Sequence, residues 1–177
     1  TTLFRSLHAS DLAPFRKGAP GTRLFNEYGP TETVVGCSVF EIGVDDDTSG
    51  AISIGRPITN TQILLLDGEL NLAPRGCVGE ICVAGSGVAR GYLGRPDLTA
   101  DRFVPNPLAG DGARMYRTGD LGRYLADGNL DFLGRVDHQV KIRGYRVELG
   151  EIESTLRRHP KLRDAVVTLS PGPEGER

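Results

Sequence analysis

Short segments that contain apolar residues occupy the middle of the chain, and turn-forming residues separate these segments. Gly occupies 24 positions and Pro 11, as is typical of a protein built from many brief strands. Turn signals such as Asp67-Gly68 and Asp127-Gly128 divide the strand candidates from one another. The candidates are residues 61–66, 79–84, 115–118 and 130–133. This spacing predicts a small barrel or sandwich.

The regions on either side of these strands have a different pattern. Residues 23–28 are predicted to form a strand that runs into a Gly-Pro turn, and residues 31–35 to start a short helix, an order typical of an α/β layer. Residues 97–103 are predicted as a surface helix. Leu149, Ile152 and Leu156 have helical spacing, and Pro160 ends that helix. Residues 165–169 are predicted as a final strand.

Charged residues stand at alternate positions in the stretch GRVDHQVKIRGYRVELGEIE, residues 134–153. Within a single strand, Arg135, Asp137, Lys141 and Arg143 would share one face, because side chains alternate across a strand. So dense a polar face indicates a functional site. Periodicity alone would equally allow an edge strand whose charges prevent aggregation.

Composition excludes several classes of protein. Of the 177 residues, 38% are hydrophobic and 25% charged, which is ordinary for a globular protein and leaves room for one domain or for one plus a piece of another. A net charge of −2 gives no reason to expect nucleic acid or anionic lipid as a partner. No apolar run approaches the roughly 20 residues that span a bilayer.

The cysteines and the chain ends indicate the redox state and the compartment that we expect for the protein. Cys37, Cys77 and Cys82 are too few and too irregularly spaced for a disulfide framework, so we expect reduced thiols. With no signal peptide, we expect a cytoplasmic protein. The chain begins without Met and stops just after a strand-like run, which indicates a piece of something longer.

Three further motifs accompany the charged stretch: NEYGPTE at 26–32, VGEICVAGSGVARGYL at 78–93 and YRTGDL at 116–121. In this order and spacing, the four together closely resemble the adenylation domain of nonribosomal peptide synthetases, within the adenylate-forming superfamily of AMP-dependent synthetases and ligases. The resemblance covers about residues 24–167. It implies an α+β fold in which the end of an α/β core layer and a distorted β-barrel occupy residues 1–136. The start of a small, mobile α+β subdomain would occupy residues 137–177.

The first motif has the chemistry for binding ATP or AMP. Tyr28 can stack on a purine and Asn26 can pair with its edge, while Gly29 permits close backbone approach. Thr31 can donate to a phosphate oxygen, and Glu32 is a hard oxygen ligand suited to Mg²⁺. The resemblance assigns these roles. Taken alone, the motif could equally be a plain turn followed by a capped helix.

The later motifs would complete the nucleotide site. The resemblance makes Asp120 the acceptor of both ribose hydroxyls and places Arg135 near the sugar and the α-phosphate. The alternatives are an Asp in a surface turn and a solvated Arg. If the resemblance holds, the phenol of Tyr28 and the carboxylate of Asp120 must face one cavity. The glycines of the second motif are expected to serve tight backbone geometry rather than phosphate binding; they are Gly85, Gly87 and Gly91.

The resemblance also implies roles in transfer and specificity. Asp137 would be the hinge before the mobile subdomain, and Lys141 would reach the active site during transfer to a phosphopantetheine thiol on a peptidyl carrier domain. Glu27, Val35 and Gly36 would form part of the amino acid pocket. Glu27 could pair with a cationic substrate or lie at the periphery, and the sequence leaves both open.

The implied activity is formation of aminoacyl-AMP from ATP and an amino acid with Mg²⁺, then transfer to the carrier thiol in peptide synthesis. An acyl- or aryl-CoA ligase of the same superfamily and a non-catalytic nucleotide-binding or docking module are the alternatives. The resemblance leaves open a small helper protein that binds the core. The family's phosphate-binding loop, the pocket Asp and the C-terminal Lys are absent from these residues, so we expect the chain alone to be inactive.

Overall fold

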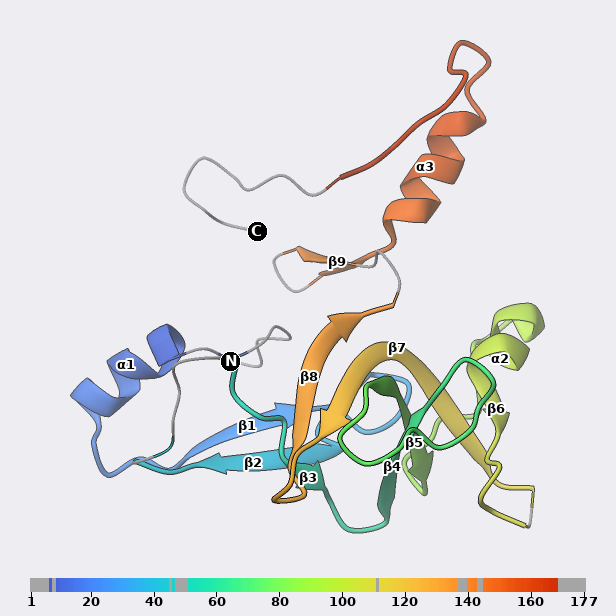
Figure 1. Ribbon diagram of the computed structural model, residues 1–177. Coiled ribbons are helices and arrows are strands. Elements are labelled where there is room, and N and C mark those ends of the chain that lie inside the picture. Colours follow the sequence, from blue (N-terminus) through green and yellow to red (C-terminus); the bar gives the residue numbers. More distant parts are fainter. Residues whose placement is uncertain are drawn as a thin grey trace. The chain divides into compact units, whose positions relative to one another are not determined.

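The structure, a computed structural model, describes residues 7, 9–44, 46, 51–110, 112–136, 140–142 and 145–168. Contacts divide the chain into two compact units, and the division falls between Val136 and Asp137 (Figure 1). Whether these units are the core and the mobile subdomain that the resemblance implies stays a prediction. The larger unit contains α1 (Ala9–Gly18), β1 (Leu24–Tyr28), β2 (Ser38–Ile42), β3 (Arg56–Pro57), β4 (Thr61–Leu66), β5 (Gly79–Gly85), α2 (Pro96–Arg102), β6 (Phe103–Pro105), β7 (Arg114–Tyr124) and β8 (Leu130–Arg135).

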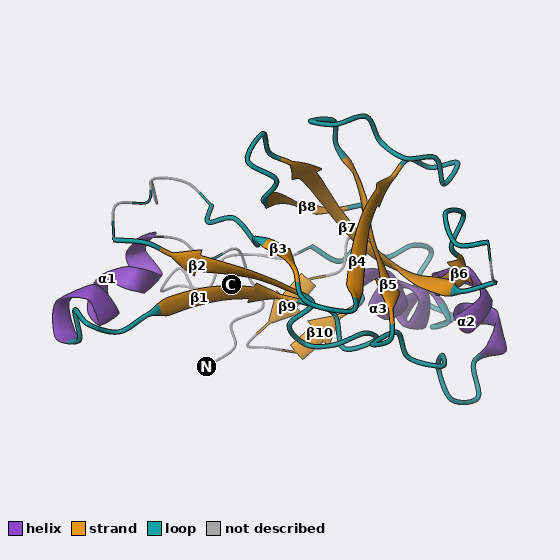
Figure 2. Ribbon diagram, turned by 90° about the horizontal axis from the view of Figure 1, so that it is seen from below, coloured by secondary structure: helices purple, strands orange, loops and turns teal. Residues whose placement is uncertain are grey.

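A three-stranded antiparallel sheet, in the order β1-β2-β3, follows α1 in the chain (Figure 2). Tyr28 pairs with Ser38, so the intervening residues form a loop that returns the chain to the same sheet. The predicted helix over residues 31–35 is wrong. The amide of Thr33 instead donates to the carbonyl of Pro30 at 3.1 Å in a turn, and β-branched residues at four of these five positions disfavour a helix.

A second, five-stranded sheet curls around the long strand β7 (Figure 1). One edge of β7 pairs with β5, while the other pairs first with β6 and then with β8; β4 pairs with the far edge of β5. Every pair is antiparallel, and register shifts occur between Glu80 and Cys82 and between Leu121 and Gly122. Such irregularities bend a strand and increase its twist. The four predicted strands are confirmed, although β7 is much longer than the predicted 115–118.

Both faces of the curled sheet are covered. Ile63 and Leu65 of β4 pack into one buried cluster, while Leu64 and Leu66 pack into another. Alternate residues of a strand point to opposite faces, so a strand buried on both sides is a continuous apolar run. The partly buried ring of Tyr28 packs against the first cluster, and this contact brings the first motif to the sheet.

The segment after β2 links the two sheets. The amide of Ile54 donates to the carbonyl of Leu130, and the amide of Leu130 donates to the carbonyl of Gly55, each at 2.9 Å. The hydroxyl of Ser53 also donates to the carbonyl of Leu130, at 2.9 Å. With helices beside these antiparallel sheets, the predicted α+β class is confirmed.

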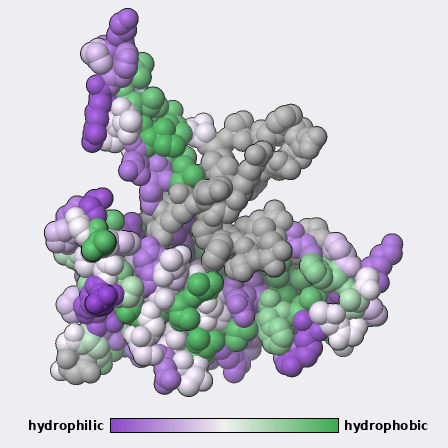
Figure 3. All heavy atoms as spheres, turned by 180° about the vertical axis from the view of Figure 1, so that it is seen from behind, coloured by the Kyte–Doolittle hydropathy of each residue, from purple (hydrophilic) through white to green (hydrophobic). Residues whose placement is uncertain are grey.

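The smaller unit contains a hairpin of β9 (Val140–Ile142) and β10 (Tyr145–Val147), followed by α3 (Leu149–Arg157). The predicted helix is confirmed, and Figure 3 shows apolar side chains gathered along one side of it. A single strand through residues 135–143 is wrong, because β8 ends at Arg135 and β9 begins at Val140.

The predicted final strand is also wrong over its described part, residues 165–168. Side chains of α3 occupy its backbone groups. The guanidinium of Arg157 donates to the carbonyl of Ala165 at 2.9 Å, and the carboxylate of Glu153 accepts the amide of Val167 at 2.9 Å. A strand needs those groups for a neighbouring strand. None of the described helices is both long and apolar enough to cross a bilayer.

Candidate nucleotide site

Three side chains from separate motifs meet where β1 approaches the curled sheet. The phenol of Tyr28 donates to Oδ2 of Asp120 at 2.5 Å, across 92 residues of sequence. The guanidinium of Arg135 donates to Oδ1 of Asp120 and, at 3.1 Å, to the carbonyl of Thr118. Asp120 and Arg135 are register partners on β7 and β8, which places the cation directly beside the carboxylate. The phenol and the carboxylate therefore face the same place, as expected.

The cluster is nearly enclosed by protein. The side chains of Asp120 and Arg135 expose only 10% and 18% of their surfaces. Burial, and then the charge of Asp120, raise the pKa of Tyr28 well above its ordinary value, so its phenol stays a proton donor. The ring of Tyr28 lies 6.1 Å from that of Phe132, tilted by 41°. An arginine and a phenol thus hold one carboxylate in a fixed orientation.

A second ion pair fixes the backbone that carries Asp120. Oε2 of Glu80 accepts the Nε and Nη2 hydrogens of Arg117 at 3.1 and 2.6 Å, while Oε1 accepts the amide of Gly119 at 3.0 Å. The hydroxyl of Thr118 donates to the carbonyl of Ile81 at 2.7 Å and accepts the amide of Asp120 at 2.9 Å. These bonds determine where β7 presents its carboxylate.

Strand β1 presents the other predicted residues on two faces. Asn26 shares the face of Tyr28, and its amide nitrogen donates to the carbonyls of Ile52 at 3.2 Å and Ser53 at 2.8 Å. Those carbonyls occupy the amide donors, so a contact of Asn26 with a purine would use its oxygen as an acceptor.

Glu27 and Gly36 lie together on the other face of β1. Glu27 is on the exposed face of β1, and a Cβ added to Gly36 would come within 3.1 Å of its Oε2. Val35, which precedes Gly36, is 52% exposed. Gly36 therefore neighbours Glu27 on the face of β1 opposite Tyr28, and Val35 precedes Gly36 in the chain.

The turn between β1 and β2 requires its glycine. A Cβ on Gly29 would lie 2.3 Å from the carbonyl oxygen of Val34 and 2.5 Å from that of Val35, closer than real atoms approach. Gly29 therefore permits the close backbone approach expected of it, although to the protein's own chain. Thr31 is exposed in this turn, where its hydroxyl is accessible to a ligand.

Glu32 lies at the end of a line of hydroxyl groups. Its Oε1 accepts the phenol of Tyr92 at 2.7 Å, and the Tyr92 oxygen is 3.1 Å from that of Tyr116 on β7. Burial, then the Tyr116 hydroxyl and the Glu32 carboxylate, raise the pKa of Tyr92, so this phenol also remains protonated. Sequence reasoning missed both tyrosines. Their places in two of the motifs were the available signal, but only the fold brings them to Glu32.

The three glycines of the second motif serve backbone geometry, as predicted. Gly85 has φ +121°, and a Cβ there would lie 2.2 Å from the carbonyl oxygen of Asn60. Gly91 has φ +140°, and its Cβ would lie 2.4 Å from Thr99. A Cβ on Gly87 would press against Val34 at 3.1 Å.

Two predicted residues cannot be placed at the site. Asp137 lies outside the described residues. The backbone of Lys141 pairs with that of Arg146 in the hairpin of the smaller unit. Their predicted roles as hinge and transfer residue therefore stay predictions.

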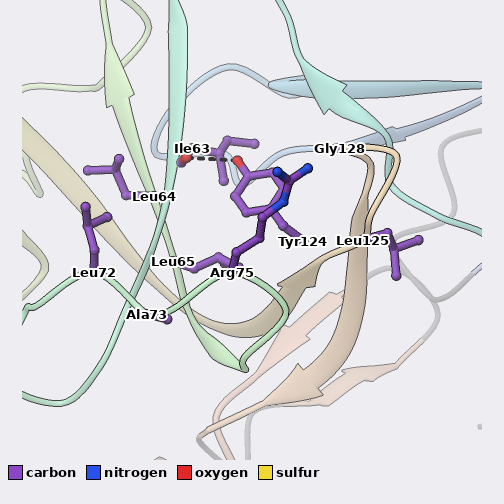
Figure 4. Close-up of a pocket in the computed structure, with 9 residues that line it drawn as sticks. All are labelled: Ile63, Leu64, Leu65, Leu72, Ala73, Arg75, Tyr124, Leu125 and Gly128. Carbon is purple, nitrogen blue, oxygen red and sulfur yellow. Dashed lines mark hydrogen bonds between the residues drawn. The ribbon is translucent and has the colours of Figure 1, made fainter.

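A shallow cavity of about 360 Å³ lies elsewhere on the curled sheet (Figure 4). It is lined mainly by aliphatic residues of β4 and the following turn, with Tyr124 and Arg75 beside them. The phenol of Tyr124 donates to the carbonyl of Ile63 at 2.9 Å. No predicted site residue lines this cavity.

Glu32 fits the expected role toward Mg²⁺ only as one ligand of a site that the protein shares with substrate phosphates. No group of three or more histidine, cysteine or carboxylate side chains among the described residues could hold a metal ion. Mg²⁺ commonly binds one or two carboxylates together with substrate phosphates rather than an all-protein cage. Glu32 is half-buried as a residue; the Tyr92 phenol orients its Oε1, and its Oε2 is buried, so the carboxylate would contribute one ligand to such a shared site.

Comparison with known proteins decides the family. The model of the AMP-binding enzyme family matches residues 5–93. The chain belongs to the AMP-binding enzyme family. It is 51% identical over 144 residues to bacitracin synthase 3 of Bacillus licheniformis, covering 81% of this chain and 2% of that protein. It is 52% identical over 145 residues to tyrocidine synthase 1 of Brevibacillus parabrevis, covering 82% of this chain and 13% of that protein.

Two solved structures are similar to the chain. PA1221, described as a nonribosomal peptide synthetase protein containing adenylation and PCP domains, superimposes with a TM-score of 0.81 at 37% identity, covering 91% of this chain and 33% of that one. IdnL1 superimposes with a TM-score of 0.85 at 32% identity, covering 94% and 35%. The resemblance to synthetase adenylation domains is confirmed. The chain spans about a third of the length of these structures.

Proposed function

We propose that this chain is part of an adenylation domain that joins an amino acid to AMP from ATP and passes the aminoacyl group to a carrier-protein thiol. The observation that carries the proposal is the meeting of Tyr28, Asp120 and Arg135 at one point. Each belongs to a different motif, and together they offer an aromatic face, a carboxylate for vicinal hydroxyls and a cation for phosphate. The similarity to peptide synthetases supports this proposal over a CoA ligase.

Each residue would act through positioning and charge. Asp120 would accept the ribose hydroxyls with its two carboxylate oxygens, which together offer about four lone-pair sites. Arg135 would lie beside the α-phosphate, where a guanidinium offsets negative charge. Thr31 would donate its hydroxyl to a phosphate oxygen. Glu32 would hold Mg²⁺, which when bound neutralises charge on the phosphates. Such a site accelerates reaction mainly by alignment and electrostatic stabilisation.

The remaining roles belong to the same proposal. Asn26 and Tyr28 would contact adenine, while Glu27, Val35 and Gly36 would form one wall of the amino acid pocket on the other face of β1. Asp137 would be the hinge and Lys141 the residue presented for transfer to phosphopantetheine on the peptidyl carrier. A cytoplasmic setting remains part of the expectation, and the binding of a helper protein to the core stays open.

Replacing Asp120 with Ala in the complete adenylation domain tests the ribose role. Two charge-assisted hydrogen bonds would be lost, and at about 1.5 kcal/mol each or more, ATP affinity should fall by roughly 100-fold. Amino-acid-dependent pyrophosphate exchange should fall with it. Asp120→Asn keeps the shape and should show a smaller loss in the same direction.

A matched control is Asp131→Ala, which also removes an arginine-paired carboxylate from the curled sheet, at 3.2 Å from Arg123, but away from the cluster. Calorimetric titration with ATP measures all three variants. Unaltered ATP affinity in Asp120→Ala, or the same loss in Asp131→Ala, would refute the ribose role.

A further inference from the structure

The glycine-rich loop, residues 85–92, touches the turn that carries Glu32 at several points. The amide of Ala89 donates to the backbone carbonyl of Glu32 at 2.9 Å. Gly87 lies against Val34 so closely that an added Cβ would be 3.1 Å from its side chain. The phenol of Tyr92 then reaches the Glu32 carboxylate at 2.7 Å. The loop therefore contacts both the backbone and the side chain of the expected metal ligand.

Tyr92 is itself held in place from three directions. Its amide donates to the hydroxyl of Thr99 on α2 at 2.9 Å. Its ring meets the ring of Phe103 edge to face, with centroids 5.4 Å apart and planes at 73°. Its oxygen lies 3.1 Å from that of Tyr116. A side chain fixed in this way can fix the group that it contacts.

The direction of the hydroxyl chain follows from the carboxylate. The phenol of Tyr92 donates its single proton to Oε1 of Glu32. The proton in the contact between Tyr92 and Tyr116 must then come from Tyr116. Successive hydroxyls polarise one another in such a chain, and this strengthens the final bond to the carboxylate.

We propose that Tyr92 is a positioning residue, which fixes the rotation of the Glu32 carboxylate so that it binds the cation of Mg·ATP. Tyr116 supports Tyr92 through the second hydroxyl contact. The inference rests on the proposed function, because it assumes that Glu32 meets the cation. Groups that orient metal ligands typically contribute about 10- to 100-fold to metal affinity. The competing role for Tyr92 is simply to join the loop to the turn.

ATP binding with and without the metal separates these roles. The complete adenylation domain is titrated calorimetrically with ATP in Mg²⁺ and again in EDTA, for Tyr92→Phe, Glu32→Gln and the double variant. Tyr124→Phe is the matched control, since it also removes the hydrogen bond of a partly buried phenol, 2.9 Å to the carbonyl of Ile63, but on the cavity side of the curled sheet. Circular dichroism melts check that each variant folds.

We expect Tyr92→Phe to lower ATP affinity about 10-fold or more in Mg²⁺ and to leave it unchanged in EDTA. The double variant should be no weaker than Glu32→Gln, because the tyrosine acts through the carboxylate. Tyr124→Phe should match the wild type. Should Tyr92→Phe not fold, Tyr116→Phe removes the supporting donor and should show a smaller loss confined to Mg²⁺.

Three results would overturn the inference. An unchanged affinity in Tyr92→Phe, with Glu32→Gln weakened, would reject the positioning role alone. Equal weakening of Tyr92→Phe in Mg²⁺ and in EDTA would mean that the phenol only holds the loop. No effect of Glu32→Gln in Mg²⁺ would reject the metal role of Glu32, and the positioning role with it.

Discussion

Replacing Glu80 with Gln perturbs the backbone under the site without touching the site itself. The Glu80 residue is 8% exposed, and its carboxylate accepts two hydrogens from Arg117 and one from the amide of Gly119. A carboxamide has almost the same shape but carries hydrogens on one side. In either orientation it would point those hydrogens at a donor, at Arg117 or at Gly119.

The cost follows from the burial of the pair. Breaking a buried ion pair costs about 3–5 kcal/mol, and hydrogen bonds to charged groups contribute about 1.5–3 kcal/mol each. The Arg117 side chain keeps 33% of its surface exposed, so water recovers part of the loss on that side. We expect Glu80→Gln to lower the free energy of unfolding by about 2–3 kcal/mol.

Urea unfolding of the complete adenylation domain, followed by circular dichroism, measures the effect. Glu41→Gln is the control, since Glu41 also takes two bonds from one guanidinium, that of Arg23, at 2.7 and 3.0 Å. That pair is exposed, with 71% of the Arg23 and 51% of the Glu41 side-chain surface accessible, so solvent screens it and the midpoint should hardly move. Equal midpoints for the two variants would refute the view that burial makes the Glu80 pair important.

Two further predictions concern the curled sheet and the turns. Burial raises the pKa of Cys37 to about 11 and that of Cys82 to about 12, so both thiols stay protonated at a pH of about 8. Of the three cysteines, alkylation mapped by mass spectrometry should therefore label only the exposed Cys77 until the protein unfolds. Labelling of Cys82 at the rate of Cys77 would contradict this prediction. Gly85→Ala should destabilise the domain by about 1–3 kcal/mol in urea melts. Gly85 has φ +121°, and the Cβ of the new alanine would lie 2.2 Å from the carbonyl oxygen of Asn60. Gly68→Ala, where a Cβ would meet nothing within 4 Å, should be neutral, and equal effects would contradict the strain argument.

The sequence predicted elements well where local pattern and packing agree. The run Thr61–Leu66 and the helix Leu149–Arg157 formed as expected, because β-branched and aliphatic residues suit a strand covered on both faces and the helical spacing of Leu149 and Leu156 suits one apolar side. The strand Ser38–Ile42 was missed because what identifies it as a strand is its pairing with Leu24–Tyr28 across the loop, which lies outside its own local sequence. The strand predicted over residues 165–168 was wrong because side chains of α3, and not a partner strand, bind its backbone.

For the site, the sequence indicated which residues take part but not how the fold brings them together. Tyr28, Asp120 and Arg135 could be named in advance because the motifs that contain them resemble those of adenylation domains. Their mutual contacts depend on the curl of β7 and the register of β8, which no local pattern encodes. Tyr92 was missed because a tyrosine after a glycine-rich loop has no special chemistry until Glu32 lies beside it.

The contact between Tyr28 and Asp120 has a consequence for chimeric synthetases made by exchanging segments. A crossover anywhere between residues 43 and 114 would give these two side chains different parents, and the amide of Asn26 would also meet carbonyls of foreign origin if the crossover preceded Ile52. Recombinants that keep residues 24–135 from one parent preserve every bond of the cluster. A hybrid joined inside that interval keeps each motif intact, but the contacts between motifs then form between residues from different parents.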